Sequence, residues 1–188
     1  MVPRPAVGGD APSEGFPPVV DSRAQVLILG SFPSAKSLAQ GQYYAHPQNQ
    51  FWKLLSLVLH RELTAMNYAE RLAVLREHRI ALWDVIGRCT RAGSLDSSIR
   101  SAQHNDFSRV LAVASRLDRV CFNGKTSGRL EPLFRQWGYA TLVLPSSSPA
   151  YTLGFGHKLA AWHAILEPLP MRRGPAAGAV MQQPPEAQ

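Results

Sequence analysis

Three short segments hold most of the side chains that could do chemistry. Two of them, residues 30–34 (Gly-Ser-Phe-Pro-Ser) and residues 144–150 (Leu-Pro-Ser-Ser-Ser-Pro-Ala), directly follow short apolar runs. If these runs are parallel strands of one sheet, both loops face the same crevice, where open α/β sheets bind ligands. The third segment, residues 43–52, contains two tyrosines, a tryptophan and Asn49. Aromatic faces and a carboxamide together can hold a planar ring with hydrogen-bonding edges, such as a nucleobase.

Asn123 is a second carboxamide that the pattern places at this crevice. It ends a mainly apolar run just before Gly124, so its side chain is expected among the strand-end loops. Its amide offers a donor and an acceptor, which complement the adjacent C=O and N–H groups of uracil or of an oxopurine. The amide turned over would fit adenine, so the residue type selects no single base. The alternative is that Asn123 is the left-handed residue of an Asn-Gly turn.

The elements that must position these residues alternate between strand and helix. Short runs rich in β-branched residues and leucine predict four strands, at residues 25–29, 80–86, 119–123 and 140–144. Helical spacing of apolar residues predicts helices at 47–60, 68–78, 106–116, 125–137 and 156–166. This order predicts an α/β fold, a three-layer α/β/α sandwich with a central four-stranded parallel sheet.

Length and charge limit the possibilities further. A chain of 188 residues, 45% of them hydrophobic, is long enough for one well-buried domain and too short for two comfortable ones. Composition rich in Pro and Gly predicts disordered tails at 1–18 and 171–188 around a domain at 19–170. The net charge of +7 favours an anionic partner, most simply nucleic acid. The alternative is a basic surface that only aids solubility.

Cysteine, histidine and hydropathy patterns argue against several protein classes. Cys89 and Cys121 are too few for a disulfide framework or a four-thiolate cluster, so we expect a reducing, cytoplasmic location and no iron–sulfur centre. The scattered histidines form no ligand-like pair near a Cys or carboxylate cluster, so no metal is expected. The chain has no apolar stretch of about eighteen residues and no signal-peptide pattern, so no membrane contact is expected.

Taken together, the motifs resemble those of a known family. Six segments stand in order at suitable spacing, which is far more specific than a lone Gly-Ser-x-Pro: residues 29–34, 43–52, 80–86, 96–100, 122–124 and 144–150. They resemble the DNA-deoxyinosine glycosylases, the hypoxanthine-excising branch of the uracil-DNA glycosylase superfamily, from about residue 26 to residue 162. The resemblance implies a compact, cofactor-free α/β/α domain that flips a deaminated base out of DNA and hydrolyses its N-glycosidic bond. We expect it to act as a monomer.

The resemblance also implies roles for three pocket residues. Asn49 would position the attacking water through its carboxamide oxygen, and because an amide is a feeble base, its contribution is orientation. Capping of the predicted helix 47–60 is the alternative for Asn49. Asn123 would read the flipped base and stabilise its departing charge. Tyr44 would stack on that base.

Phe32 departs from the wider superfamily. Relatives that act on uracil or mismatched thymine carry an Asp or Asn at this position, in contact with the attacking water. Phenylalanine cannot make that contact, which favours hypoxanthine over uracil as the substrate. Phe32 would pack beside the base or be ordinary core, and Ser31 would contact the base or its flanking phosphate.

The serine-rich loop resembles the segment that relatives press into the DNA minor groove. Ser146, Ser147 and Ser148 can donate hydrogen bonds to phosphates, and Lys158, near the start of the last predicted helix, is a further candidate phosphate contact. The loop lacks an evident large aliphatic wedge, for which Tyr151 or Leu153 could substitute. The alternative is a plain serine-rich surface turn.

Other functions remain open at this point. Within enzymes, the runner-up is a uracil or mismatched-thymine glycosylase. A non-catalytic sensor of damaged DNA would share the charge and the aromatic pocket but would not turn over. Mononucleotide binding lacks support because residues 30–34 form neither a P-loop nor a Gly-x-Gly-x-x-Gly turn. A bifunctional lyase is disfavoured because no lysine stands within the pocket motifs to form a Schiff base.

Overall fold

A central parallel sheet organises the molecule. The computed structural model describes residues 12–168. All neighbouring strands of the sheet are parallel, in the order β3 (Ile80–Asp84), β2 (Val26–Gly30), β6 (Arg119–Asn123) and β7 (Ala140–Leu144). The two strands β3 and β6 are buried at every residue, as expected where helices cover both faces of a sheet. The predicted four-stranded parallel sheet is therefore confirmed.

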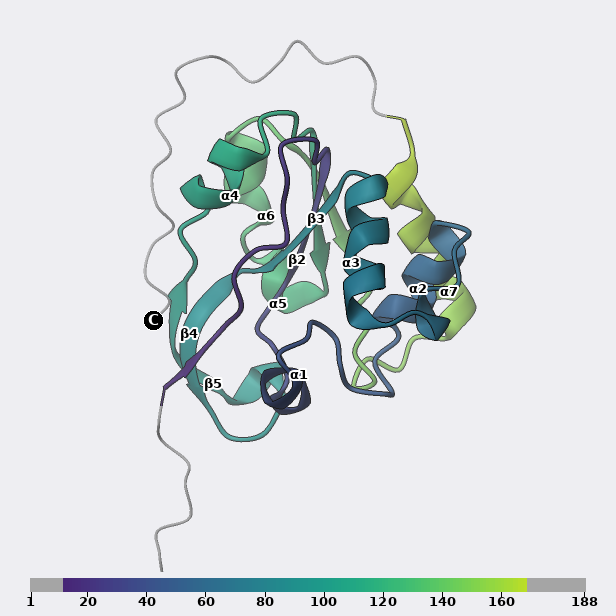
Figure 1. The fold of residues 1–188 in the computed structure, drawn as a ribbon. Coiled ribbons are helices and arrows are strands. Elements are labelled where there is room, and N and C mark those ends of the chain that lie inside the picture. Colours follow the sequence, from purple (N-terminus) through teal and green to yellow (C-terminus); the bar gives the residue numbers. More distant parts are fainter. Residues whose placement is uncertain (1–11, 169–188) are drawn as a thin grey trace, which may run out of the picture.

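Helices form a layer on each side of this sheet. Figure 1 shows α2 (Phe51–Val58), α3 (Tyr68–Glu77) and α7 (Phe155–Trp162) on one side and α4 (Ser108–Val113) and α6 (Glu131–Gln136) on the other. Aromatic rings fill each layer: Phe51 packs against Trp162 in the first, and Phe107 against Phe134 in the second. All four side chains are fully buried. The predicted three-layer α/β/α sandwich is confirmed.

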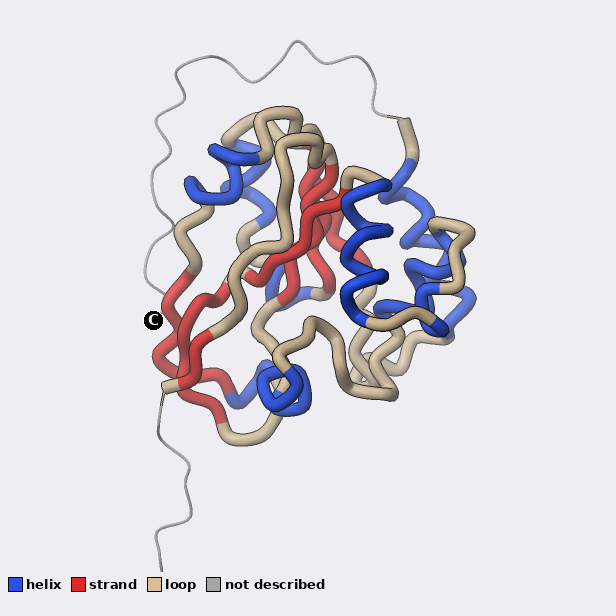
Figure 2. The backbone as a smooth tube through the Cα atoms, viewed as in Figure 1, coloured by secondary structure: helices blue, strands red, loops and turns tan. Residues whose placement is uncertain are grey.

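A second, smaller sheet was not predicted. After β3 and Val85 the chain enters β4 (Ile86–Arg91), which pairs antiparallel with β5 (Ile99–His104) and β1 (Ser13–Glu14). Figure 2 shows these strands apart from the central sheet. The predicted strand at 80–86 is therefore divided between two sheets. The alternation of buried and exposed residues in β4 and β5 is broken by register shifts, so neither strand has a regular period in the sequence.

The N-terminal segment differs from the tail predicted at 1–18. Gly15 N–H donates to the carbonyl of Gly87 (2.8 Å), and the indole of Trp83 donates to the carbonyl of Phe16 (2.9 Å). Residues 12–18 therefore belong to the folded unit, although their composition is rich in proline. Proline lacks an N–H but keeps its carbonyl as an acceptor, and Pro17 accepts a hydrogen bond from the Tyr43 hydroxyl. Residues 1–11 and the predicted tail 171–188 lie outside the described residues.

The predicted helices are present with altered bounds. The helix predicted at 125–137 is two, α5 (Lys125–Gly128) and α6, because Pro132 near the start of α6 has no N–H to continue the first helix. The helix predicted at 156–166 is α7 followed directly by the 3₁₀ turn η3 (His163–Leu166). Three short helices were not predicted, namely α1 (Ala35–Gln40) and the 3₁₀ turns η1 (Leu63–Ala65) and η2 (Asp96–Ser98). Within residues 12–168, no helix is long and apolar enough to cross a membrane.

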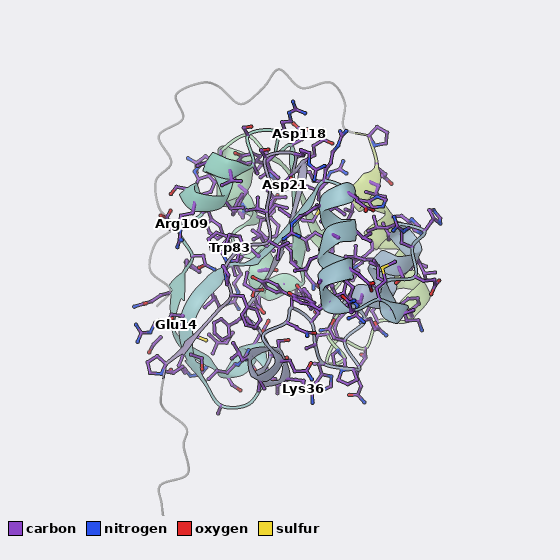
Figure 3. All side chains as sticks on the ribbon, in the orientation of Figure 1. Glu14, Asp21, Lys36, Trp83, Arg109 and Asp118 are labelled. Atoms are coloured by element: carbon purple, nitrogen blue, oxygen red, sulfur yellow. The ribbon has the colours of Figure 1, made fainter. Side chains whose placement is uncertain are left out.

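The direction of the strands places their exit loops at one end of the molecule. In Figure 3, Lys36, which follows the loop after β2, lies at the opposite end from Asp118, which precedes β6. Because all four strands of the central sheet are parallel, every loop that follows one of them lies at the Lys36 end. The two loops singled out from the sequence, residues 30–34 and 144–150, are therefore brought to the same end.

Candidate active site

A cavity of about 250 Å³ opens at the carboxyl ends of the strands. Nine of the ten residues that the sequence pointed to line it: Ser31, Phe32, Tyr44, Asn49, Asn123, Ser146, Ser147, Ser148 and Tyr151. These residues come from loops that are far apart in the sequence. The exception is Lys158, which is not among the lining residues.

Tyr44 presents an aromatic face to the cavity in a strained backbone conformation. Its φ of 54° lies in the left-handed region, which a tyrosine rarely adopts and which recurs at functional sites. The Tyr44 ring stacks on Phe51, with the ring centroids 3.7 Å apart and the planes at 11°. Since Phe51 covers one face of the ring, only the other face is left for a ligand to stack on. Burial raises the pKa of Tyr44, so its hydroxyl stays protonated.

Asn123 is held in one orientation by the serine loop. The backbone N–H of Ser147 donates to Asn123 Oδ1 (2.8 Å), and Asn123 Nδ2 donates to Ser147 Oγ (2.8 Å) and to the Tyr44 hydroxyl (3.1 Å). Turning the amide over would bring Nδ2 against the Ser147 N–H, two donors facing each other. A base that accepts a hydrogen bond from Nδ2 must replace the Tyr44 hydroxyl as the acceptor. The Asn-Gly alternative does not hold, because the positive φ belongs to Gly124 (101°) and not to Asn123.

Asn49 lies in the turn before α2 and also lines the cavity. Its Oδ1 accepts a hydrogen bond from the N–H of Phe51 (3.0 Å), the first residue of the helix. Gln50, which directly precedes the helix, makes no side-chain capping bond. The capping contact considered from the sequence therefore exists. A carboxamide oxygen accepts two hydrogen bonds, so the second lone pair of Oδ1 can still receive one from water.

The three serines of the loop do not share one role. Ser147 is fully buried, and its carbonyl accepts from Gln50 N–H (2.9 Å), which ties the loop to the start of α2. Ser147 therefore holds Asn123 and cannot contact a phosphate, contrary to the sequence prediction. Ser146 and Ser148 are half-buried, and Tyr151 is 40% exposed, so these three keep access to a ligand at the rim.

Lys158 requires a second correction. We expected it to contact a phosphate, but it is only 1% exposed and points beneath the serine loop from α7. Its ammonium donates to the carbonyls of Tyr151 (2.7 Å) and Ser148 (3.4 Å). Loss of solvation lowers its pKa, the expected effect of burying a lysine. Lys158 therefore supports the loop from below. This role could not be predicted from the sequence, because lysines are almost never fully buried.

Comparison with known proteins agrees with this arrangement. The profile described as the Uracil DNA glycosylase superfamily matches residues 17–166. The chain belongs to the uracil DNA glycosylase superfamily. Two curated relatives carry the name hypoxanthine DNA glycosylase, and each is 42% identical to this chain. The Methanosarcina acetivorans protein matches over 80% of this chain and 96% of its own length, and the Methanosarcina barkeri protein over 79% and 94%.

A solved structure supports the same assignment. It is the solution NMR structure of a putative uracil DNA glycosylase from Methanosarcina acetivorans. It superimposes with a TM-score of 0.75 at 42% identity, over 82% of this chain and 96% of that one. The family resemblance seen in the six sequence segments and the glycosylase fold are both confirmed.

Two acidic residues line the glycosylase pocket but were not predicted from the sequence as site residues. Asp96, from η2, accepts a hydrogen bond from the Ser31 hydroxyl (2.8 Å) and so ties the smaller sheet to the loop after β2. Asp84, the last residue of β3, is 3% exposed, and its Oδ2 has no hydrogen-bond partner in the described structure. Both lie in segments that carried the resemblance. A carboxylate at the end of the apolar run 80–86 was a signal that could have been used.

Phe32 forms part of the wall of the cavity. Phe32 is 6% exposed, with the Arg91 guanidinium 5.1 Å from its ring centroid, so it lines the cavity as part of the core. Among residues 12–168, no group of three or more His, Cys, Asp or Glu side chains is placed to hold a metal ion.

Proposed function

We propose that this protein is a monofunctional DNA glycosylase that removes hypoxanthine from deoxyinosine in DNA. The observation that carries the proposal is the convergence of Tyr44, Asn49 and Asn123 on one cavity. The 42% identity to two proteins named hypoxanthine DNA glycosylase supports the choice of base. The cavity then holds a flipped base, stacked on the free face of Tyr44 and hydrogen-bonded to Asn123.

The chemistry follows from the charges that develop during excision. When the bond between C1′ and the base nitrogen breaks, positive charge grows on the sugar and negative charge on the base. Asn49 orients a water toward C1′ through the free lone pair of its Oδ1, while its other lone pair stays on Phe51 N–H. The Nδ2 of Asn123 donates to the carbonyl oxygen of the departing base and stabilises its charge.

The surroundings of Phe32 support hypoxanthine over uracil. Its ring is buried against Arg91 and has no polar atom to contact a water. Asn49 is therefore the side chain left to orient the water, without the Asp or Asn described above for relatives that act on uracil. The rim residues Ser146, Ser148 and Tyr151 contact the DNA backbone and fill the gap left by the flipped nucleotide.

We also propose that the protein acts as a monomer and that it works in the cytoplasm. The two free, buried cysteines fit the reducing conditions of that compartment.

A panel of DNA substrates tests the proposal. Otherwise identical duplexes and single strands, each with one hypoxanthine, uracil, xanthine or mismatched thymine, are incubated with purified protein and assayed for alkali-labile sites. We expect multiple turnovers on hypoxanthine and much weaker action on uracil. Activity should survive EDTA, and borohydride should trap no covalent adduct, because no pocket lysine is present to form a Schiff base. Preferential release of uracil would contradict the assignment of hypoxanthine as the substrate. DNA binding without release of any base would favour a non-catalytic sensor of damaged DNA.

A further inference from the structure

Asp84 is a buried carboxyl group that the reaction outlined above leaves unused. It is 3% exposed, it lines the cavity, and its Oδ2 has no hydrogen-bond partner in the described structure. A buried polar atom without a partner is destabilising and is rarely kept without a reason. An unpaired oxygen in a substrate cavity can be satisfied when the substrate enters.

The backbone around Asp84 is built to let its carboxyl group into the cavity. Asp84 is paired with Gly30 on the neighbouring strand. A Cβ at position 30 would overlap Asp84 Oδ1 and would lie 2.7 Å from the Tyr44 hydroxyl. Only glycine at position 30 leaves both groups in place. The Asp84 carboxyl therefore lies close to the tyrosine hydroxyl that Asn123 contacts.

The depth of Asp84 indicates which part of a substrate it meets. The flipped base enters first, while its sugar stays attached to the DNA at the mouth of the cavity. Asp84 and Asn123 are buried, whereas Asn49 is half-buried. The carboxyl group therefore faces the base and not the water that attacks the sugar.

The strand order places Asp84 and Asn123 at different edges of that base. They end β3 and β6, which lie on either side of β2, so roughly 10 Å separates their backbones, two strand spacings. If Asn123 takes the edge with O6 and N1–H, Asp84 contacts another edge of the purine. The most basic nitrogen left on hypoxanthine is N7.

We propose that Asp84 is a further catalytic residue, a neutral carboxylic acid that protonates N7 of the departing hypoxanthine. This inference rests on the proposed function. The C1′–N9 bond breaks and its electron pair goes to the base, while the water oxygen forms a new bond to C1′. The Asp84 proton moves to N7, so hypoxanthine leaves as a neutral molecule. The water releases a proton to solvent, and the carboxylate recovers one from solvent.

The charges around Asp84 favour its neutral form. Burial and the nearby Asp96 raise the pKa of Asp84 to about 8, and only Arg91, from β4, acts in the opposite direction. The neighbouring Tyr43 and Tyr44 hydroxyls stay neutral because burial raises the pKa of each. At neutral pH the carboxyl group is therefore mostly protonated. An ionised Asp84 would repel the negative charge that grows on the base.

The pH dependence of excision tests this role. Single-turnover rates on hypoxanthine DNA are measured from pH 6 to pH 9.5 for the parent protein, Asp84→Asn and a matched control, Asp21→Asn, which changes a half-buried carboxylate that is paired with Arg23 outside the cavity. We expect the parent rate to be level at low pH and to fall above about pH 8. Asp84→Asn should be slower at pH 7 by about 10²-fold or more, and its rate should not fall at alkaline pH. The control should match the parent.

Each alternative outcome has a defined meaning. If Asp84→Asn matches the parent, or if the parent rate stays level to pH 9.5, Asp84 is not the acid. If both proteins lose activity above pH 8, the titrating group lies elsewhere and the proposal is wrong. A ¹³C NMR titration of the parent protein with labelled aspartate needs no variant. The proposal requires one aspartate carboxyl resonance whose chemical shift titrates with a midpoint near pH 8. Failure of the parent to release hypoxanthine would instead contradict the proposed function.

Discussion

Two carboxamides share the pocket but are fixed by different neighbours. Asn123 uses its amide hydrogens and its oxygen within the protein, so it is rigid before any base arrives. Asn49 uses one lone pair on the start of α2 and keeps the other. Sequence spacing could predict that both residues reach one crevice, since each stands at the end of an element. The capping contact of Asn49 could also be considered from the sequence, because its partner is two residues away. The partners of Asn123 could not be predicted, because they depend on the path of residues 144–150.

Asn49→Ala separates binding from chemistry. We expect it to leave DNA binding nearly intact and to lower single-turnover excision by about 10²-fold or more, because a positioned water is lost. Loss of the bond to Phe51 N–H should lower the free energy of unfolding by about 1 kcal/mol, measured by circular dichroism melting. Gln48→Ala, at an exposed neighbouring position, is the control. Excision at the parent rate by a folded Asn49→Ala protein would mean that another group orients the water.

The strands β2, β3 and β6 of the central sheet were predictable because burial on both faces leaves a plain apolar signal. The smaller sheet was not, because β4 and β5 mix buried and exposed residues and contain register shifts. The burial of two charged residues was also not predicted. Asp84 and Lys158 look like surface residues in the sequence, and only the strand and helix packed around each one place them inside.

Lys158 offers a test of how α7 supports the serine loop. Lys158→Met removes both hydrogen bonds to the loop carbonyls while keeping most of the buried apolar chain. We expect faster amide hydrogen exchange at residues 148–151 and a lower rate of excision, with DNA affinity reduced less than the rate. Lys36→Met, at an exposed site, should leave the exchange unchanged. Unchanged exchange in Lys158→Met would show that the loop holds its shape without this brace.

At the scale of the whole molecule, the positive charge and the cavity act on two parts of the same substrate, the DNA backbone and the base. The net charge of +7 attracts the DNA backbone without regard to sequence, and the cavity tests the bases one at a time. The charge could be read from composition alone. Its alternative, a surface that only aids solubility, makes no specific prediction about DNA.

Salt titration distinguishes these two interpretations. We expect the affinity for duplex DNA to fall steeply between low and physiological salt, with a slope of about 0.9 on logarithmic axes for each phosphate neutralised. Fluorescence anisotropy with a labelled duplex measures this slope. Single-stranded DNA should give a shallower slope, about 0.7 for each phosphate. An affinity that does not change with salt would show that electrostatic attraction does not contribute to DNA binding.

The fixed amide of Asn123 has a consequence for the undamaged bases around every lesion. Deamination replaces an amino group of a base with a carbonyl oxygen. The Ser147 N–H keeps Nδ2 of Asn123 pointing into the cavity, so the amide cannot turn over to suit adenine. An adenine in the cavity would set its amino group against that donor, at a cost of about 1–3 kcal/mol, a factor of roughly 5 to 150. If Asn123 reads the base as proposed, one backbone N–H in the serine loop helps the protein to spare normal adenine while it searches for its deaminated form.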